Sequence, residues 1–179
     1  MSSMVTRPLF PPEKFDLPGG AATIRAIRPD DAPRLQAFVG RLSPDSIYYR
    51  FMTSLRELSD ETAAQLVNVD YRQRMALVAT LPDGDDEIII GVARYGVRPT
   101  APDRAEVAIV VEDRYQRNGL GRFLLRRLSE YARQHGIRAL TATLSANNVR
   151  VKEFIKRLSL PVKVVTADHG ELDVEVSLD

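Results

Sequence analysis

The sequence predicts one α/β or α+β domain built on a mixed sheet, and three observations support this. The chain has 179 residues, of which 44% are hydrophobic and 27% charged, a composition typical of a globular domain with a sizeable core. Strand-like and helix-like segments alternate from Thr23 to the C-terminus. Between residues 107 and 125, an apolar β-branched run precedes a polar turn with two glycines and an amphipathic segment, which indicates a buried strand, a tight turn and a helix.

The individual elements follow from local patterns. Strands are expected where apolar and β-branched residues gather or alternate, over residues 23–28, 75–81, 87–95, 104–112, 139–144, 162–166 and 172–178. Helices are expected to begin at Pro29, Pro44 and Leu58, and two more are expected over residues 119–134 and 147–158. Residues 98–103 contain two prolines and are expected to form a loop. Residues 1–20, rich in proline and small residues, are expected to form an extended N-terminal arm, and residues 21–179 a single domain.

Composition excludes several kinds of site. The chain has no cysteine, so it has no disulfide, no thiolate metal site and no cysteine nucleophile. His135 and His169 are expected at a helix end and in a turn, and two histidines supply a metal site or a serine–histidine triad poorly, so no metal is expected. The net charge of +1 favours neither a nucleic-acid nor a membrane partner. No apolar run approaches the roughly 20 residues of a membrane span, and no signal pattern begins the chain, so a cytoplasmic location is expected.

The turn after the apolar strand has the pattern Gln-x-x-Gly-x-Gly, from Gln116 to Gly121. Glycine lets backbone N–H groups approach a ligand, and the first N–H groups of a helix favour an anion. The segment therefore predicts a phosphate site, although a tight turn without a ligand has the same glycine spacing. It is neither a nucleotide-triphosphate loop, since no Gly-Lys-Ser/Thr follows, nor a dinucleotide fingerprint, since Leu124 replaces the third glycine.

The motif and the order of elements resemble the GNAT superfamily of N-acetyltransferases over nearly the whole chain from Thr23. Gln116–Gly121 matches the superfamily's Gln/Arg-x-x-Gly-x-Gly/Ala motif between a strand and a helix. A second motif begins with an asparagine, here Asn148, and runs to Leu158. The likeness is greater to bacterial Pat-type protein lysine acetyltransferases, through the segments 27–31, 42–51 and 105–108. The resemblance implies a mixed, mostly antiparallel sheet of about seven strands flanked by helices.

The resemblance also implies acetyl-CoA as cosubstrate. The backbone amides of Arg117, Asn118, Gly119, Leu120 and Gly121 would hold the pyrophosphate, with Gln116 in the same motif. The strand edge at Ile109, Val110 and Val111 would hydrogen-bond the pantetheine arm, and a bulge there would aim an N–H at the thioester. Asn148 is either a contact to the cofactor arm or a helix cap. Arg117, Arg122, Arg150 and Lys152 are either contacts to CoA phosphates or ordinary exposed charges.

Glu106 is the candidate general base, because it begins the central strand and matches the base-like glutamate of the Pat-type pattern. We expect burial to raise its pKa; the alternative is a solvated glutamate or a partner of Arg104 or Arg94. In the superfamily a tyrosine often serves as the general acid, and its position is occupied here by Ile155. Tyr115, Tyr95 and Ser159 are other candidate proton donors for the leaving thiolate. Glu112 and Asp113 are expected to be a solvated strand end.

The sequence supports three functional hypotheses. The first is an N-acetyltransferase that acetylates a primary amine, such as a protein lysine, by direct attack. The second is a CoA-binding sensor without transferase activity, suggested by the missing tyrosine. The third is an acetyltransferase of small-molecule amines. The N-terminal arm and the final hairpin are plausible contacts of a homodimer.

Overall fold

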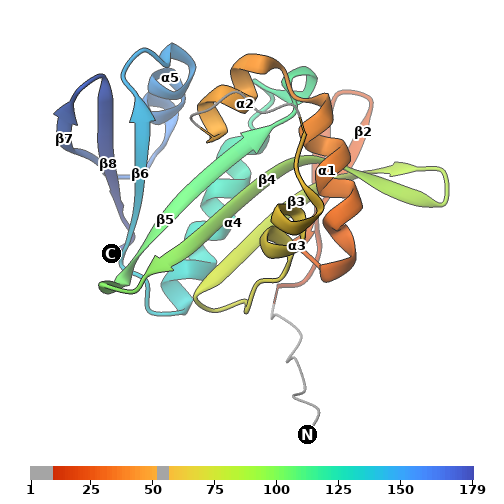
Figure 1. Cartoon of the computed structure of the whole chain (residues 1–179), viewed down its shortest axis with the longest axis horizontal. Coiled ribbons are helices and arrows are strands. Elements are labelled where there is room, and N and C mark those ends of the chain that lie inside the picture. The colour runs from red at the N-terminus through yellow and green to blue at the C-terminus, as the bar shows by residue number, and fades with distance from the viewer. Residues whose placement is uncertain (1–9, 52–56) are drawn as a thin grey trace, which may run out of the picture.

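The computed structural model describes residues 10–51 and 57–179, which form one eight-stranded sheet with helices on both faces (Figure 1). Its strands, in order across the sheet, are β1 (Glu13–Leu17), β2 (Gly20–Ala26), β3 (Arg74–Asp83), β4 (Asp86–Arg98), β5 (Ala101–Val111), β6 (Ala139–Ser145), β8 (Glu171–Ser177) and β7 (Val162–Asp168). The pairing of β5 with β6 is parallel, and the other strand pairs of this sheet are antiparallel. The expectation of a mixed, mostly antiparallel sheet is confirmed.

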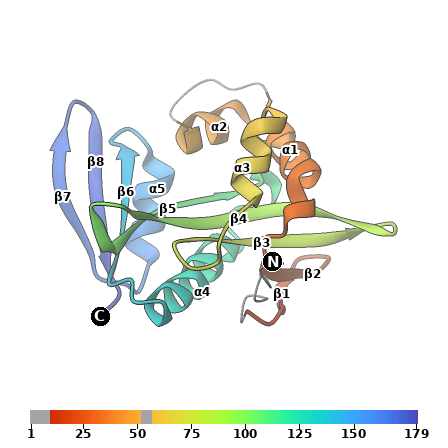
Figure 2. The same ribbon diagram turned by 60° about the horizontal axis from the view of Figure 1, so that its bottom comes forward.

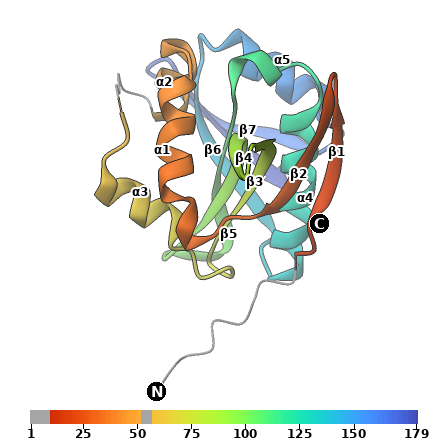
Figure 3. The ribbon, with the colours of Figure 1, turned by 90° about the vertical axis from the view of Figure 1, so that its right-hand side faces the viewer.

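The helices cover the two faces of the sheet separately. They are α1 (Ala32–Arg41), α2 (Pro44–Phe51), α3 (Asp60–Val67), α4 (Leu120–Gln134) and α5 (Val149–Arg157). Figure 3 shows α1, α2 and α3 on one side of the sheet and α4 on the other. Two apolar cores result, one under α1 and α3 and a larger one under α4, against which Phe154 and Leu158 of the α5 segment also pack. In this part of the chain no helix is long and apolar enough to cross a membrane.

Helix α4 is fixed on the sheet by the amphipathic pattern seen in the sequence. Leu120, Leu124, Leu128 and Tyr131 are all buried, and each fully buried leucine stabilises the fold by about 1.5–3 kcal/mol. Gly91 in β4 permits this close approach, because a Cβ there would lie 3.3 Å from Leu124 Cδ1. At its far end the helix is closed by Gly136 at φ +82°. The start of α4, next to the glycine turn, is therefore held against β4 and β5.

Three expectations about elements need correction. The sheet has eight strands, because residues 13–17 of the expected N-terminal arm pair with β2 as β1. The strand expected first, over residues 23–28, is therefore the second, and it ends at Ala26. The loop expected over residues 98–103 is mostly strand, since β4 runs to Arg98 and β5 begins at Ala101. Regular pairing along the sheet overrides the local preference of Pro102 for a loop, as the proline lies at a strand end.

Strands β5 and β6 separate shortly after they begin. Their parallel pairing joins only residues 104–106 to residues 139–141. Beyond Glu106, β5 continues beside β4 while β6 turns away with β8 and β7, and Figures 1 and 2 show this fork from two directions. One side of β5 is left without a neighbouring strand over residues 107–111.

Candidate active site

A cleft of about 1170 Å³ occupies the fork between β5 and β6. It is lined by β5 from Glu106 to Val111, by the turn before α4, by β6 and by one side of α5. The structure therefore brings together the site residues predicted from the sequence: Glu106, Ile109, Val110, Val111, Gln116, Arg117, Asn118, Gly119, Gly121, Arg122 and Asn148 all line it. Leu120 differs, because its side chain is buried in the core and only its backbone can face a ligand.

The open edge of β5 presents backbone groups to the cleft at every second residue. The Glu112 N–H donates to Ile90 O in β4, whereas the Asp103 carbonyl accepts from Arg138 N on the β6 side. Because backbone groups alternate along a strand, the N–H and C=O groups of Val107 and Ile109 point into the fork. The β4–β5 register is continuous from Val111 to Ala105, so the expected bulge does not lie in this stretch. The hydrogen-bond donors and acceptors that face the cleft are therefore the backbone groups of the regular strand edge.

The turn before α4 is shaped by two residues with positive φ. Arg117 lies at φ +65° and Gly119 at φ +82°. The first backbone hydrogen bond of the helix runs from Phe123 N to Gly119 O, 3.0 Å, so the N–H groups just before Phe123 have no acceptor in the helix. They lie at the positive end of the helix dipole and beside the cleft, an arrangement that suits a phosphate.

Asn148 caps the helix that forms the other wall of the cleft. Its Oδ1 accepts a hydrogen bond from Val151 N at 3.1 Å, and the residue is buried. The cap that the sequence allowed is thus present. The cap uses the amide oxygen, and the amide nitrogen is the donor that could reach a ligand in the cleft.

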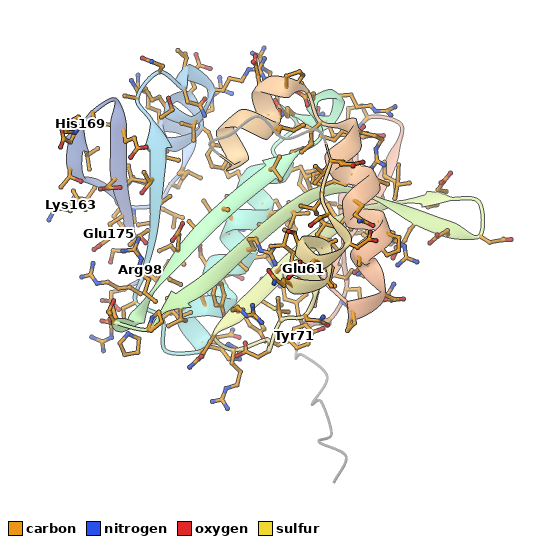
Figure 4. All side chains as sticks on the ribbon, in the orientation of Figure 1. Glu61, Tyr71, Arg98, Lys163, His169 and Glu175 are labelled. Atoms are coloured by element: carbon orange, nitrogen blue, oxygen red, sulfur yellow. The ribbon has the colours of Figure 1, made fainter. Side chains whose placement is uncertain are left out.

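Glu106 lies at the narrow end of the fork, where β5 and β6 part. Its side chain is 65% exposed, and Oε2 lies 3.9 Å from Arg98 Nη2. The expectation that Glu106 is buried is wrong, because its side chain lies on the sheet face opposite α4, and the apolar core on that face, which Val110 contacts, does not reach it. Its partner is Arg98 rather than Arg104, which pairs with Glu175, or Arg94, which donates to Leu66 O. In Figure 4, Arg98 and Glu175 lie at this end of the sheet.

Comparison with known families accounts for this arrangement. Residues 45–159, which include the cleft and the glycine turn, match the model of the acetyltransferase (GNAT) family. The chain belongs to this family. GNAT enzymes transfer an acetyl group from acetyl-CoA to an amine, so the expected enzyme class is confirmed.

Individual relatives share both sequence and fold with this GNAT domain. Acetyltransferase PA5475 of Pseudomonas aeruginosa is 33% identical over 135 residues, which cover 75% of this chain and 72% of that protein. Acetyltransferase Pat of Mycolicibacterium smegmatis is 29% identical over 155 residues, but this chain spans only 45% of its length. The crystal structure of the GNAT domain of S. lividans PAT superposes with a TM-score of 0.81 at 30% identity, covering 94% of this chain and 99% of that one.

A Salmonella typhimurium structure with acetyl-CoA as its cofactor has the same fold, with a TM-score of 0.62 at 20% identity over 88% of this chain and 94% of that one.

The donors considered for the leaving thiolate occupy three different environments in the GNAT fold. Tyr95 is buried, its hydroxyl donates to Arg72 O, and burial raises its pKa, so it cannot serve the cleft. Ser159 is exposed after α5 and does not line the cleft. Tyr115 lines the cleft at the end nearest the glycine turn, and Ile155 fills part of the α5 wall.

Basic side chains surround the same end of the GNAT cleft. Arg117, Arg122 and Arg150 line it, whereas Lys152 does not. Within residues 10–51 and 57–179, no group of three or more histidine, aspartate or glutamate side chains is placed to hold a metal ion.

Two acidic residues expected to be a solvated strand end are bound within the protein. Glu112 is 3% exposed and accepts from Arg41 Nε at 3.1 Å and Arg114 Nε at 3.0 Å. Asp113 accepts from Ser43. The sequence interpretation also missed Ser46 and Val107 as cleft residues. The alternation of β5 could have identified Val107, but no local signal identifies Ser46, whose partners are about 70 positions away.

Proposed function

We propose that this GNAT enzyme transfers the acetyl group of acetyl-CoA to a primary amine, that a protein lysine is the acceptor, and that Glu106 is the general base. One observation carries the proposal: the fork between β5 and β6 joins a helix start suited to phosphate with an open strand edge that ends at a carboxylate. The similarity to Pat proteins supports lysine as the acceptor.

The cleft fits the chemical groups of acetyl-CoA in order. The N–H groups at the start of α4 match a pyrophosphate, and Arg117, Arg122 and Arg150 supply positive charge around it. The backbone groups of Val107 and Ile109 match the two amides of a pantetheine arm added beside β5 as an extra strand. A thioester at the end of that arm then lies near the Val107 N–H. A backbone donor of this kind stabilises a developing oxyanion by roughly 3–4 kcal/mol.

Glu106 is placed to accept a proton from the incoming amine, directly or through one water. Its side chain points to the sheet face opposite α4, because Ala105 and Val111 pack in the core under α4 and alternate with it along β5. The acceptor therefore approaches from the α1–α3 face while the pantetheine arm lies in the plane of the sheet. Attack forms the C–N bond, the C–S bond breaks, and the thiolate of CoA leaves.

Tyr115 is too far from Glu106 to act on the same bond. Residues 106–111 of an extended strand span about 17 Å, and Tyr115 follows beyond them at the glycine-turn end. We therefore assign protonation of the thiolate to water.

The proposal is tested with Glu106→Gln. Because the chain has no cysteine, a thiol reagent detects only the released CoA. Removing the base should lower kcat/KM by about 100-fold or more, with the Kd of acetyl-CoA unchanged. The matched control is Glu171→Gln, an exposed carboxylate at the start of β8 that should retain full activity. Equal activity of Glu106→Gln and wild type would refute the role of Glu106.

The acceptor is identified by screening lysine peptides and small amines with the wild-type protein. Turnover of lysine peptides in a sequence-dependent way supports a protein modifier. Turnover of small amines alone would show that the acceptor is a metabolite amine and not a protein lysine. Binding of acetyl-CoA without turnover of any acceptor would favour the CoA-binding sensor.

A further inference from the structure

The N-terminus of α2 is attached to the turn that follows β5. Asp113 Oδ1 accepts from the backbone N–H of Ser43 at 3.0 Å, and Oδ2 accepts from Ser43 Oγ at 2.7 Å and Ser46 Oγ at 3.1 Å. Ser43 Oγ in turn accepts from Ser46 N at 3.2 Å, as an N-cap does. One carboxylate thus holds the first turn of α2 at three points.

The neighbours of Asp113 strengthen this attachment. Gln116 donates to Val111 O at 2.9 Å and lies 3.4 Å from Ser46 Oγ. Arg41, at the end of α1, donates to Glu112 and to Ile89 O. The junction between α1 and α2 is therefore bound to residues 112–116, which lead directly into the glycine turn.

Asp113 carries a negative charge at the start of a helix, which the helix dipole favours. Burial opposes its ionisation, but the hydrogen bonds from Ser43 and Ser46 outweigh this and lower its pKa. On its other side, Arg150 of α5 lies 3.9 Å from Oδ2 and also lines the cleft. Asp113 thus lies between α5, which forms one wall of the cleft, and α2 on the α1–α3 face.

We propose that Asp113 is a positioning residue that makes the placement of α2 depend on the glycine turn being occupied. The inference rests on the proposed function, since acetyl-CoA is the ligand of that turn. Residues 113–115 form one 3-10 turn that ends at Gln116, so a ligand that fixes residues 117–121 also fixes the carboxylate that holds α2. Helix α2 lies beside β5 on the face that Glu106 faces (Figure 1), so its position sets the path of the amine.

The test is hydrogen–deuterium exchange of the whole protein with and without acetyl-CoA, with no acceptor added. In the wild type, acetyl-CoA should slow exchange in residues 117–122 and also in residues 44–51, by about threefold or more in both. In Asp113→Asn, protection of residues 117–122 should remain and that of residues 44–51 should be lost. Asp45→Asn makes the same charge change on the exposed side of α2 and should behave as the wild type.

A kinetic measurement separates positioning from a general loss of structure. Asp113→Asn should raise the KM of the best lysine peptide about tenfold, while the Kd of acetyl-CoA changes less than twofold. If Asp113→Asn fails to fold, Ser43→Ala takes its place. It removes one hydroxyl donor to Asp113, keeps the carboxylate, changes no residue that lines the cleft, and should give the same split.

The outcomes are distinct for the two proposals. If acetyl-CoA protects residues 117–122 but not 44–51 in the wild type, or if Asp113→Asn retains the protection of α2, the positioning role is refuted and the proposed function stands. If acetyl-CoA protects neither segment, the ligand assignment fails, and the inference fails with it.

Discussion

The glycine turn allows a sharp test of where the pyrophosphate binds, because the chain offers two glycines with the same positive φ. Gly119 starts α4 at φ +82° and Gly136 ends it at φ +82°. A Cβ at Gly119 would meet atoms no closer than 3.9 Å, and one at Gly136 would meet nothing within 4 Å, so neither substitution causes a clash. The perturbation by alanine is therefore backbone strain alone.

The expected cost is similar for both variants. A residue with a Cβ in the left-handed region loses about 1–2 kcal/mol relative to glycine. For a domain of this size, each kcal/mol lowers Tm by about 2–4 °C, so both Gly119→Ala and Gly136→Ala should unfold roughly 2–8 °C below the wild type. Differential scanning calorimetry measures this without ligand.

The two variants should differ once acetyl-CoA is added. Relief of the strain at position 119 turns the N–H groups of residues 117–121 away from the phosphate, and a loss of 1.4 kcal/mol weakens binding tenfold. Isothermal titration should therefore give a Kd for acetyl-CoA about tenfold higher in Gly119→Ala and unchanged in Gly136→Ala. A Kd within twofold of the wild type in Gly119→Ala, with its Tm lowered as in Gly136→Ala, would refute the pyrophosphate assignment.

Two further predictions concern Asn148 and Asp31. Asn148→Asp keeps the capping oxygen and should leave stability within about 0.5 kcal/mol of the wild type, whereas Asn148→Ala should cost about 1 kcal/mol in urea unfolding. If the amide nitrogen of Asn148 contacts acetyl-CoA, both variants should bind acetyl-CoA more weakly than the wild type. Equal affinity of the wild type and the two variants would show that Asn148 serves only as a helix cap. Asp31, fully buried, accepts from Arg25, Arg28 N and Arg34, and Arg25 also donates to Glu87. Because Arg25 keeps Glu87 as a carboxylate partner, Asp31→Ala should cost about 1.5–3 kcal/mol, the loss of hydrogen bonds to a charged group.

Burial opposes ionisation of Asp31, but these hydrogen bonds prevail and lower its pKa, so its contribution is complete above about pH 4 and lost as the pH falls further. A wild-type protein no more sensitive to acid than Asp31→Ala would contradict this.

The fold could be predicted from the sequence wherever the signal was local. Helix α4 shows its buried leucines at helical spacing and a glycine just after its end, and the structure follows both. Strand β1 was missed because Glu13–Leu17 mixes charged and apolar residues beside Pro18 and Gly19, and only pairing with β2 makes it a strand. Its existence is a property of the sheet rather than of the segment.

The site could be predicted in its motif but not in its surroundings. The spacing of Gln116, Gly119 and Gly121 identified the turn, and the cleft includes them all. The exposure of Glu106 depends on how far the core on the α1–α3 face extends along β5, which no pattern within β5 reveals. The partners of Asp113 depend likewise on contacts across 70 and 67 positions of sequence. Both features depend on contacts between residues far apart in the sequence, so composition and periodicity could not predict them.

The alternation of β5 explains how one strand can serve both reactants. Residues with odd numbers from Val107 to Val111 turn their backbone groups to the fork and their side chains toward α4, whereas Glu106, Ala108 and Val110 face the α1–α3 side, where Val110 packs against that core. Under the proposed function, the backbone of β5 therefore binds the acetyl donor and its side chains meet the acceptor, on different sides of the same strand. A one-residue insertion in β5 after Glu106 would exchange these roles. Substitutions at Ala108 can therefore alter acceptor choice while leaving the backbone contacts to acetyl-CoA in place.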